Sequence, residues 1–223
     1  MQRHFDEELS KFNEELLRMA ALTEEAIRKA IESVKNCDGK SARIVIEEDK
    51  RIDELEIVIE EMGIELIARR QPLAIDLRFI TTGLRINSEL ERMADLAVNI
   101  SQCAIMIADK PLIKPLTDIT KLSILAQKMV KNSIDSFVNT NEDLARQVIL
   151  NDPEADALKR AVYDELVNEY IVKDGSCAPR AIPLILVSRH LERICDHATY
   201  IAEDVIYMIK ALIVKHHPEK LEK

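Results

Sequence analysis

Apolar residues recur at alternating steps of four and three positions from the start of the chain. The first such seam runs through Phe5, Leu9, Phe12, Leu16, Met19, Ala26 and Ala30, with Thr23 in one place. This spacing keeps apolar side chains on one face of an α-helix. The pattern therefore predicts a long amphipathic helix, which ends at the turn-forming residues 36–40.

Turn residues and prolines divide the remaining chain into five more predicted helices. We expect them at about residues 41–69, from after Pro72 to about 109, and at about 116–139, 141–173 and 179–215. Pro153 lies inside the fifth of the six helices. Because proline lacks a backbone N–H and clashes with the preceding turn, we expect a kink or a break there.

The second half of the chain repeats the pattern of the first. The third predicted helix has its seam at Ile86, Leu90, Met93, Ala97, Ile100, Ala104 and Ile107. The positions 101 residues later are Val187, Leu191, Ile194, Ala198, Ile201, Val205 and Met208, all apolar again. The positions 103 residues after Val45, Ile46, Asp49, Asp53 and Leu55 hold the same five residue types. We infer an internal duplication, and an all-α fold of two tandem three-helix bundles, residues 1–112 and 113–223.

Composition narrows the class of protein further. The 223 residues include only 4 Gly, 7 Pro and 4% aromatics, too few turn formers for a hairpin-rich β fold. The net charge of -9 disfavours binding to the nucleic-acid backbone. The sequence contains no signal-peptide pattern and no apolar run long enough for a membrane span. We expect a cytoplasmic protein whose four cysteines are free thiols.

Four carboxylate pairs at a spacing of four residues accompany the duplication. They are Asp49 with Asp53, Glu91 with Asp95, Asp152 with Asp156, and Glu192 with Asp196. Side chains four residues apart share one face of a helix, where like charges repel unless something positive compensates them. Two pairs on facing helices would offer carboxylate oxygens to a cation such as Mg, Ca, Mn or Fe. The pairs therefore predict metal binding, against the simpler reading of solvated acidic faces.

Other residue types give weaker signals. No histidine has a glutamate three residues before it, so the Glu-x-x-His motif of ferritin-like di-iron proteins is absent. His197 is a possible additional ligand, but a surface or capping role is the better expectation, and Cys195 is expected to be a small core residue. We expect ion pairs within the chain for six arginines: Arg78, Arg85, Arg92, Arg180, Arg189 and Arg193. No nucleophile elbow or Gly-rich phosphate loop is present, and we expect no enzymatic activity.

Three segments resemble the PhoU family, accessory regulators of the phosphate-specific transport system. They are QPLAIDLR at residues 71–78, LERMADLAVNI at 90–100 and LERICDHA at 191–198. The resemblance implies a six-helix, two-bundle fold and a cytoplasmic homodimer that reaches the membrane only through its partners. It also implies repression of the phosphate-starvation response and of phosphate uptake, by linking the phosphate ABC transporter to a sensor histidine kinase.

The resemblance further implies metal ions bound through an E/D-x-x-x-D motif in each bundle. The motif falls on the four acidic pairs. Iron is the first expectation, with Zn, Mg, Ca, Mn or Ni as other candidates. Asn99 extends the stripe of Glu91 and Asp95 by one turn and adds a possible carbonyl ligand, whereas the matching position is Tyr200. Two alternatives stay open: a carboxylate-bridged metal-storage or redox bundle, and a metal-free helical adaptor of another phosphate carrier.

Overall fold

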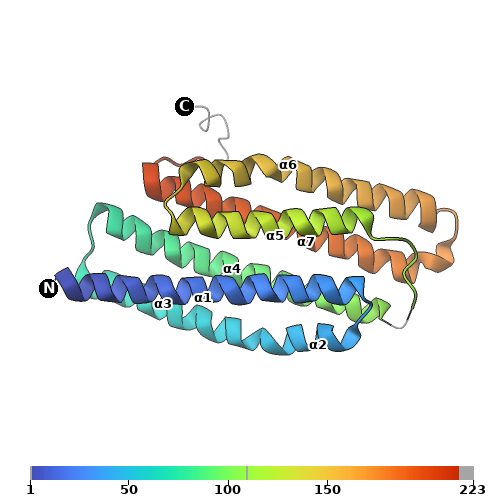
Figure 1. Ribbon diagram of the computed structural model, residues 1–223, viewed down its shortest axis with the longest axis horizontal. Helices are drawn as coiled ribbons and strands as arrows, with labels where there is room; N and C mark the ends of the chain where they lie inside the picture. The colour runs from blue at the N-terminus through green and yellow to red at the C-terminus, as the bar shows by residue number, and fades with distance from the viewer. Residues whose placement is uncertain (1, 109, 216–223) are drawn as a thin grey trace.

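Seven α-helices form the protein in a computed structural model that describes residues 2–108 and 110–215 (Figure 1). They are α1 (Gln2–Lys35), α2 (Gly39–Glu48), α3 (Lys50–Arg70), α4 (Ala74–Ile107), α5 (Thr117–Val138), α6 (Glu142–Glu165) and α7 (Ala178–Lys210). A π-helical segment, Leu166–Ile171, extends α6, and a 3-10 turn, Gly175–Cys177, precedes α7. No strand occurs in the described residues, so the predicted all-α fold is confirmed.

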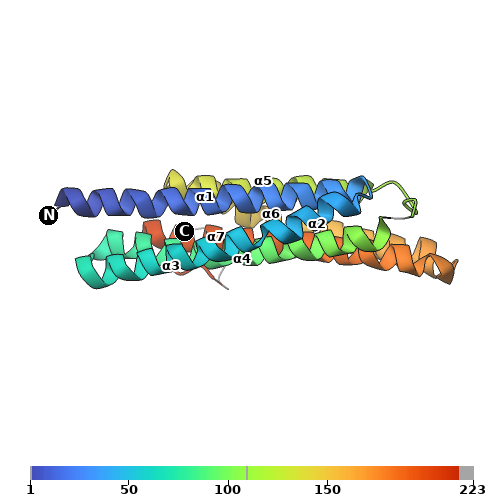
Figure 2. The same ribbon diagram turned by 90° about the horizontal axis from the view of Figure 1, so that it is seen from below.

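The helices lie along one long axis as two similar three-helix units (Figure 1). One unit contains α1, the α2–α3 pair and α4, and the other contains α5, α6 and α7. The central helices α4 and α7 run in opposite directions and form the most extensive helix–helix contact of the structure. Figure 2 shows α1 and α5 in one layer, with α3, α4 and α7 in the other. The predicted pair of duplicated bundles is therefore present.

The apolar seams of α4 and α7 are the centre of the core. All fourteen seam residues named above are buried, with at most 3% of each residue exposed to solvent. The α1 seam packs on the same core, where Phe12 and Met19 are fully buried. Thr23, the polar member of that seam, is also buried and donates its hydroxyl hydrogen to the carbonyl oxygen of Leu90 at 3.3 Å. The periodicity thus identified the core faces correctly.

The turn after the first helix of each unit is built in the same way twice. Cys37 and Thr140 occupy matching positions and adopt left-handed conformations, with φ of 50° and 49°. The next residue in each unit caps the following helix: Asp38 accepts from the backbone N–H of Ser41 at 3.1 Å, and Asn141 from that of Leu144 at 3.0 Å. Short Asx side chains favour both caps because they accept hydrogen bonds from free N–H groups of the first turn.

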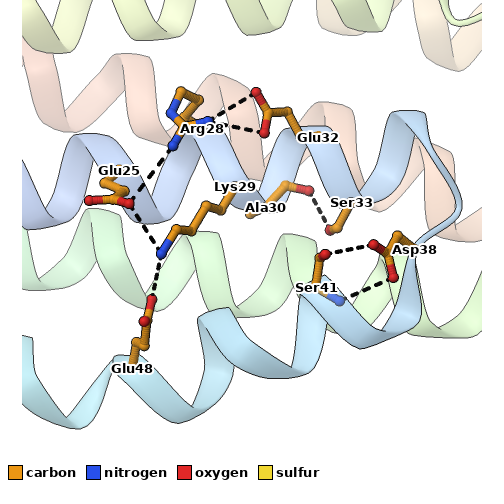
Figure 3. Close-up of polar contacts among 9 residues, drawn as sticks. All are labelled: Glu25, Arg28, Lys29, Ala30, Glu32, Ser33, Asp38, Ser41 and Glu48. Atoms are coloured by element: carbon orange, nitrogen blue, oxygen red, sulfur yellow. Dashed lines mark hydrogen bonds and ion pairs between the residues drawn. The ribbon is translucent and has the colours of Figure 1, made fainter.

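Charged side chains add a link between α1 and α2 near this turn (Figure 3). The Lys29 ammonium lies 3.1 Å from a Glu25 oxygen on its own helix and 2.8 Å from a Glu48 oxygen on α2. These contacts raise the pKa of Lys29, with the hydrogen bond to Glu48 as the largest cause. The link holds the end of α2 against α1, directly before Asp49.

The structure divides one predicted helix and keeps another continuous. The predicted helix 41–69 is divided at Asp49, where the Ile52 N–H turns back to the Asp49 carbonyl at 2.7 Å, one residue closer than in an α-helix. The fifth predicted helix, by contrast, does not break at Pro153, which lies inside the continuous α6. Proline has no N–H to donate to the Ile149 carbonyl, and the helix continues without that hydrogen bond.

The last helix also ends earlier than predicted. It stops at Lys210 instead of about residue 215, and Ala211 adopts a left-handed conformation with φ of 54°. Its N–H still reaches the Tyr207 carbonyl at 2.8 Å. This turn lets Val214 pack against the core, where it is 3% exposed.

The described residues agree with two expectations from composition. Within residues 2–108 and 110–215, no helix has an apolar stretch that could cross a membrane. All four cysteines are free thiols, and Cys103, Cys177 and Cys195 are buried.

Close packing of α1 on α4 leaves no room for a side chain at Gly83. A Cβ atom there would lie 2.6 Å from Cε1 of Phe12 and 2.8 Å from Cδ1 of Leu16. We expect Gly83→Ala to lower the free energy of unfolding, because overpacking costs about 1–3 kcal/mol while the gain in helix propensity is about 1 kcal/mol. Urea denaturation followed by circular dichroism measures the difference.

Gly175 supplies the matched control. A Cβ atom there meets no described atom within 4 Å, and Gly175 has no positive φ. We expect Gly175→Ala to change the free energy of unfolding by no more than about 0.5 kcal/mol. A Gly83→Ala protein as stable as the parent would contradict the packing described for α1 and α4.

Candidate metal-binding faces

The first unit carries a cluster of five carboxylates where α2 and α3 face α4. Asp49 lies at the junction of α2 and α3, Asp53 and Glu56 lie on α3, and Glu91 and Asp95 lie on α4. Asp49, Glu56 and Glu91 are half-buried, whereas Asp53 and Asp95 are exposed. We call these five residues the first acidic face. Sequence reasoning identified four of them and missed Glu56.

Mutual repulsion within the first acidic face appears in the pKa values. Burial and the nearby charges of Asp53 and Asp95 raise the pKa of Asp49 to about 6. Burial raises the pKa of Glu91 to about 7, with Asp95 as the next cause. The pKa of Glu56 is raised too, by burial first. Because Glu91 on α4 is affected by charges on α3, the two helices present one electrostatic site.

No described side chain neutralises the negative charge of the first acidic face by direct contact. Among the described residues, none donates a hydrogen bond to its five carboxylates or forms an ion pair with them. Arg92 follows Glu91 in the chain and lowers its pKa slightly against the other causes, but its guanidinium lies 4.0 Å from Glu89 instead. The face therefore carries a concentration of negative charge that a bound cation would relieve.

The second unit carries the matching carboxylates between α6 and α7. Asp152 and Asp156 lie on α6, and Glu192 and Asp196 lie on α7. Here Lys159 bridges the two helices: its ammonium lies 2.7 Å from Asp156 and 2.5 Å from Glu192. We call these four carboxylates the second acidic face.

Lys159 changes the electrostatics of the second acidic face. Its hydrogen bond is the largest cause that lowers the pKa of Asp156. Burial and then the charge of Glu192 still raise the pKa of Asp196 to about 6. The pKa of Asp152 is also raised by burial, while a 3.4 Å hydrogen bond donated by Thr199 lowers it. The second acidic face is thus partly neutralised by the protein itself.

The two faces differ most at one matched position. The residue 103 positions before Lys159 is Glu56, so a carboxylate of the first unit corresponds to an ammonium of the second. Sequence reasoning missed the change from Glu56 to Lys159, which the repeat offset alone reveals.

The fit of a metal ion can be judged from the donors on each face. Within the part of the chain that the structure describes, no three His, Cys, Asp or Glu side chains converge as a ready ligand set. The first acidic face still fits a hard cation by chemistry, because it supplies carboxylate oxygens from two helices with no competing cation. The second acidic face fits less well, because Lys159 already occupies oxygens of Asp156 and Glu192.

Two residues beside the second acidic face have defined places in the structure. His197 was expected at the surface or at a helix cap, and this is wrong. It is 5% exposed, and its Nδ1 atom lies 2.5 Å from an oxygen of Glu89 on α4, so it joins the two units. Cys195 is fully buried, as expected of a core residue, and burial raises the pKa of its thiol strongly.

The predicted asymmetry between Asn99 and Tyr200 is visible in their surroundings. The half-buried side chain of Asn99 forms no hydrogen bond with the described residues. Tyr200 instead packs edge-on against His197, with 5.8 Å between ring centroids, and the Lys215 ammonium lies 5.1 Å from its ring. Tyr200 is thus engaged in packing at the position where the first unit has an amide.

The ion pairs expected for the arginines form in two of six cases. The Arg85 guanidinium lies 2.7 Å from Asp204, a contact between α4 and α7, and Arg92 approaches Glu89 within its own helix. The Arg85 side chain is 57% exposed, so water screens its ion pair with Asp204.

The other four arginines contradict that expectation. Arg78 and Arg180 donate to backbone carbonyls at 3.0 and 3.4 Å. Arg189 and Arg193 form no ion pair with any described residue. Arg92 and Arg193, which follow Glu91 and Glu192 in the chain, therefore form no ion pair with the acidic faces.

Comparisons with known proteins agree with the fold and the repeat. A family model described as "PhoU domain" matches residues 16–104 and again 119–205. The "phosphate-specific transport system accessory protein PhoU homolog" of Aquifex aeolicus is 41% identical over 209 residues, 94% of each chain. The crystal structure of PhoU from Pseudomonas aeruginosa has a TM-score of 0.90 and 32% identity, and the match covers 93% of this chain and 100% of that one. That of the regulatory protein PhoU from Streptococcus pneumoniae, at 24% identity and a TM-score of 0.87, shows the same fold.

The pKa of Glu91 predicts the pH dependence of stability. Its folded-state value of about 7 exceeds the ordinary 4.5, so the folded chain holds a proton that the unfolded chain has released. Stability should fall as the pH rises from about 4.5 to about 7, and the full penalty should remain above pH 7. In chelator-treated protein at pH 8, we expect Glu91→Gln to raise the free energy of unfolding by about 1 kcal/mol, allowing for solvent screening.

Urea denaturation at pH 8 and pH 4 measures this effect, which should vanish at the lower pH. Glu192→Gln is the matched control, because Glu192 is bound by Lys159 and its loss should give no gain in stability. Equal stabilisation by both substitutions at pH 8 would contradict the electrostatic difference between the two faces.

Proposed function

The chain belongs to the PhoU family, and from this membership we propose that it is an accessory protein of phosphate-specific transport. The observation that carries the proposal is the 41% identity, over 94% of both chains, to a relative that bears this name. The match extends through both repeats of the domain. The proposed role is regulatory and not enzymatic.

In the proposed role, the protein represses phosphate uptake and the phosphate-starvation response when phosphate is plentiful. It does so by contacting the phosphate ABC transporter and a sensor histidine kinase. It works in the cytoplasm as a homodimer and meets the membrane through these partners. The elongated helical units support this role, because long antiparallel helices offer extended surfaces for protein contacts.

Metal binding on the first acidic face is part of the proposal. Carboxylates of Asp49, Asp53, Glu56, Glu91 and Asp95 would hold the ion, with iron as the first candidate. The bound ion would supply positive charge between α3 and α4. These residues would set the position of the ion, because α3 and α4 bring carboxylates with raised pKa values together. Among the described residues, no side chain forms an ion pair with these carboxylates. We assign the second acidic face a weaker affinity because of Lys159.

Deletion of the gene in its source organism tests the regulatory role. We expect a reporter of the phosphate-starvation response to become active in phosphate-rich medium, since the repressing link is lost. Phosphate uptake, measured with labelled phosphate, should rise as well. A plasmid copy of the gene should restore both readouts. A reporter that stays repressed and uptake that stays unchanged in the deletion strain would refute the proposal.

Metal content per chain tests the assignment of the faces. Protein purified without chelator or affinity-column metal, then analysed by mass spectrometry, should contain bound metal. We expect Asp95→Asn to lower metal affinity about tenfold or more, because even outer-shell changes cost about 10- to 100-fold. Asp196→Asn, the matched change on the second acidic face, should leave most of the metal in place.

Two results would contradict this assignment. Metal lost from Asp196→Asn but kept by Asp95→Asn would reverse the order of the two faces. No metal in the parent protein, even after reloading with ferrous iron, would remove metal binding from the proposal while leaving the regulatory role to the deletion experiment.

A further inference from the structure

A groove of about 620 Å³ lies between α6 and α7 in the second unit. Its lining includes four cations, Lys159, Arg160, Arg189 and Arg193, and two carboxylates. In a chain with a net charge of -9, this gathering of positive charge on one surface is unusual. The groove is therefore a cationic region on an acidic protein.

Three of these cations form no direct polar contact with the described residues. Lys159 is bound to Asp156 and Glu192, as described above. Arg160, Arg189 and Arg193 are exposed and form neither an ion pair nor a hydrogen bond through their side chains with the described residues. Arg189 and Arg193 are four residues apart on α7, a spacing at which like charges destabilise a helix. Arg160 and Arg193 lower the pKa values of Asp156 and Asp196 from a distance, but no described carboxylate holds either guanidinium in a direct contact.

The carboxylates at the groove cancel part of this charge. Glu192 of the lining and Asp156 next to it are both paired with Lys159. Asp196 of the lining forms no ion pair or hydrogen bond with a described residue. Four cations against these three carboxylates leave one excess positive charge, and it lies on the exposed arginines.

Apolar surface accompanies the arginines in the same groove. Ile185 and Leu186 are half-buried in its lining, and Tyr163 is 52% exposed. Arginine and tyrosine are enriched where proteins contact one another, and the planar guanidinium matches a carboxylate with two parallel hydrogen bonds. A lone inorganic anion would use the charge but not the apolar wall or the volume.

The first unit lacks this set of residues at the matched positions. The repeat offsets place Glu56, Ile57, Glu60 and Ser88 where the second unit has Lys159, Arg160, Tyr163 and Arg189. Of the three free arginines, Arg193 alone has an arginine counterpart, Arg92. The cationic groove is therefore particular to the second unit, where it includes Glu192 and Asp196 of the second acidic face.

We propose that the groove between α6 and α7 is a docking site for an acidic segment, interspersed with apolar residues, of a partner protein. The carboxylates of the segment pair with Arg160, Arg189 and Arg193, and its apolar side chains rest on Ile185, Leu186 and Tyr163. Complementary charge attracts such a segment, while the acidic remainder of the surface repels it elsewhere. The proposal stands on the groove and needs no bound metal.

Selection from a phage-displayed library of random peptides on the immobilised full-length chain tests the proposal. We expect the enriched peptides to contain Asp or Glu together with Leu, Ile or Phe. An enriched peptide, made synthetically with a fluorescent label, should bind in solution with an affinity that falls as salt is added. Replacing its acidic residues by amides should weaken binding.

Substitutions on both units locate the binding. The double variant Arg160→Ala with Arg189→Ala should weaken binding by about tenfold or more, as expected for anchoring arginines. Arg43→Ala with Arg51→Ala removes the same charge from exposed positions of the first unit and should leave the affinity unchanged. Circular dichroism verifies that both proteins are folded.

Four outcomes would overturn the proposal. In the first, the selection enriches no peptides, or only neutral or basic ones. In the second, the acidic peptide binds both double variants equally well. In the third, inorganic phosphate displaces that peptide at equimolar concentration. The fourth is a parent dimer in analytical ultracentrifugation that the groove variant dissociates and the peptide does not affect, since a second copy of the chain would then be the occupant.

Discussion

Burial of the seams of α4 and α7 is the constraint on which the rest of the structure depends. These two helices contribute fourteen buried apolar residues along their length and pack against each other across the boundary between the units. Each of the eleven Ile, Leu, Val and Met side chains among them stabilises the fold by about 1.5–3 kcal/mol relative to exposure. The outer helices complete the core around this pair, so the seams determine which faces of α4 and α7 are left to carry charge.

The faces left outside the seams have diverged between the two units. Where the first unit has Glu56, the second has Lys159, which forms one ion pair within α6, with Asp156, and one across to α7, with Glu192. Packing does not require either choice, since both positions lie outside the buried seam. The same fold therefore supports an acidic face without ion pairs among the described residues in one unit, and in the other a partly neutralised face that shares Glu192 and Asp196 with a cationic groove.

Periodicity predicted the fold well because burial acts on every turn of a long helix. The acidic pairs were also predictable, since their positions follow from the repeat offset. The division at Asp49 was not, because it depends on local hydrogen bonding that residue type does not determine. The burial of His197 was missed for a similar reason: its partner, Glu89, is 108 residues away and meets it only through the antiparallel contact of α4 with α7. Contacts between the units leave no periodic signal in either repeat.

The polar contacts between α4 and α7 are not repeated at the positions that the duplication relates. Arg85 with Asp204 and Glu89 with His197 join α4 to α7 by polar contacts. At the positions related by the repeat offset, Leu186 corresponds to Arg85, and Leu96 to His197. If the two repeats were identical, each polar pair would occur twice. Since the duplication, either one copy of each pair has been lost or the present pairs have been gained. Both contacts cross from α4 to α7, so a shift of one helix along the other would separate the paired side chains. The register of α4 on α7 sets where the acidic faces and the cationic groove lie relative to one another.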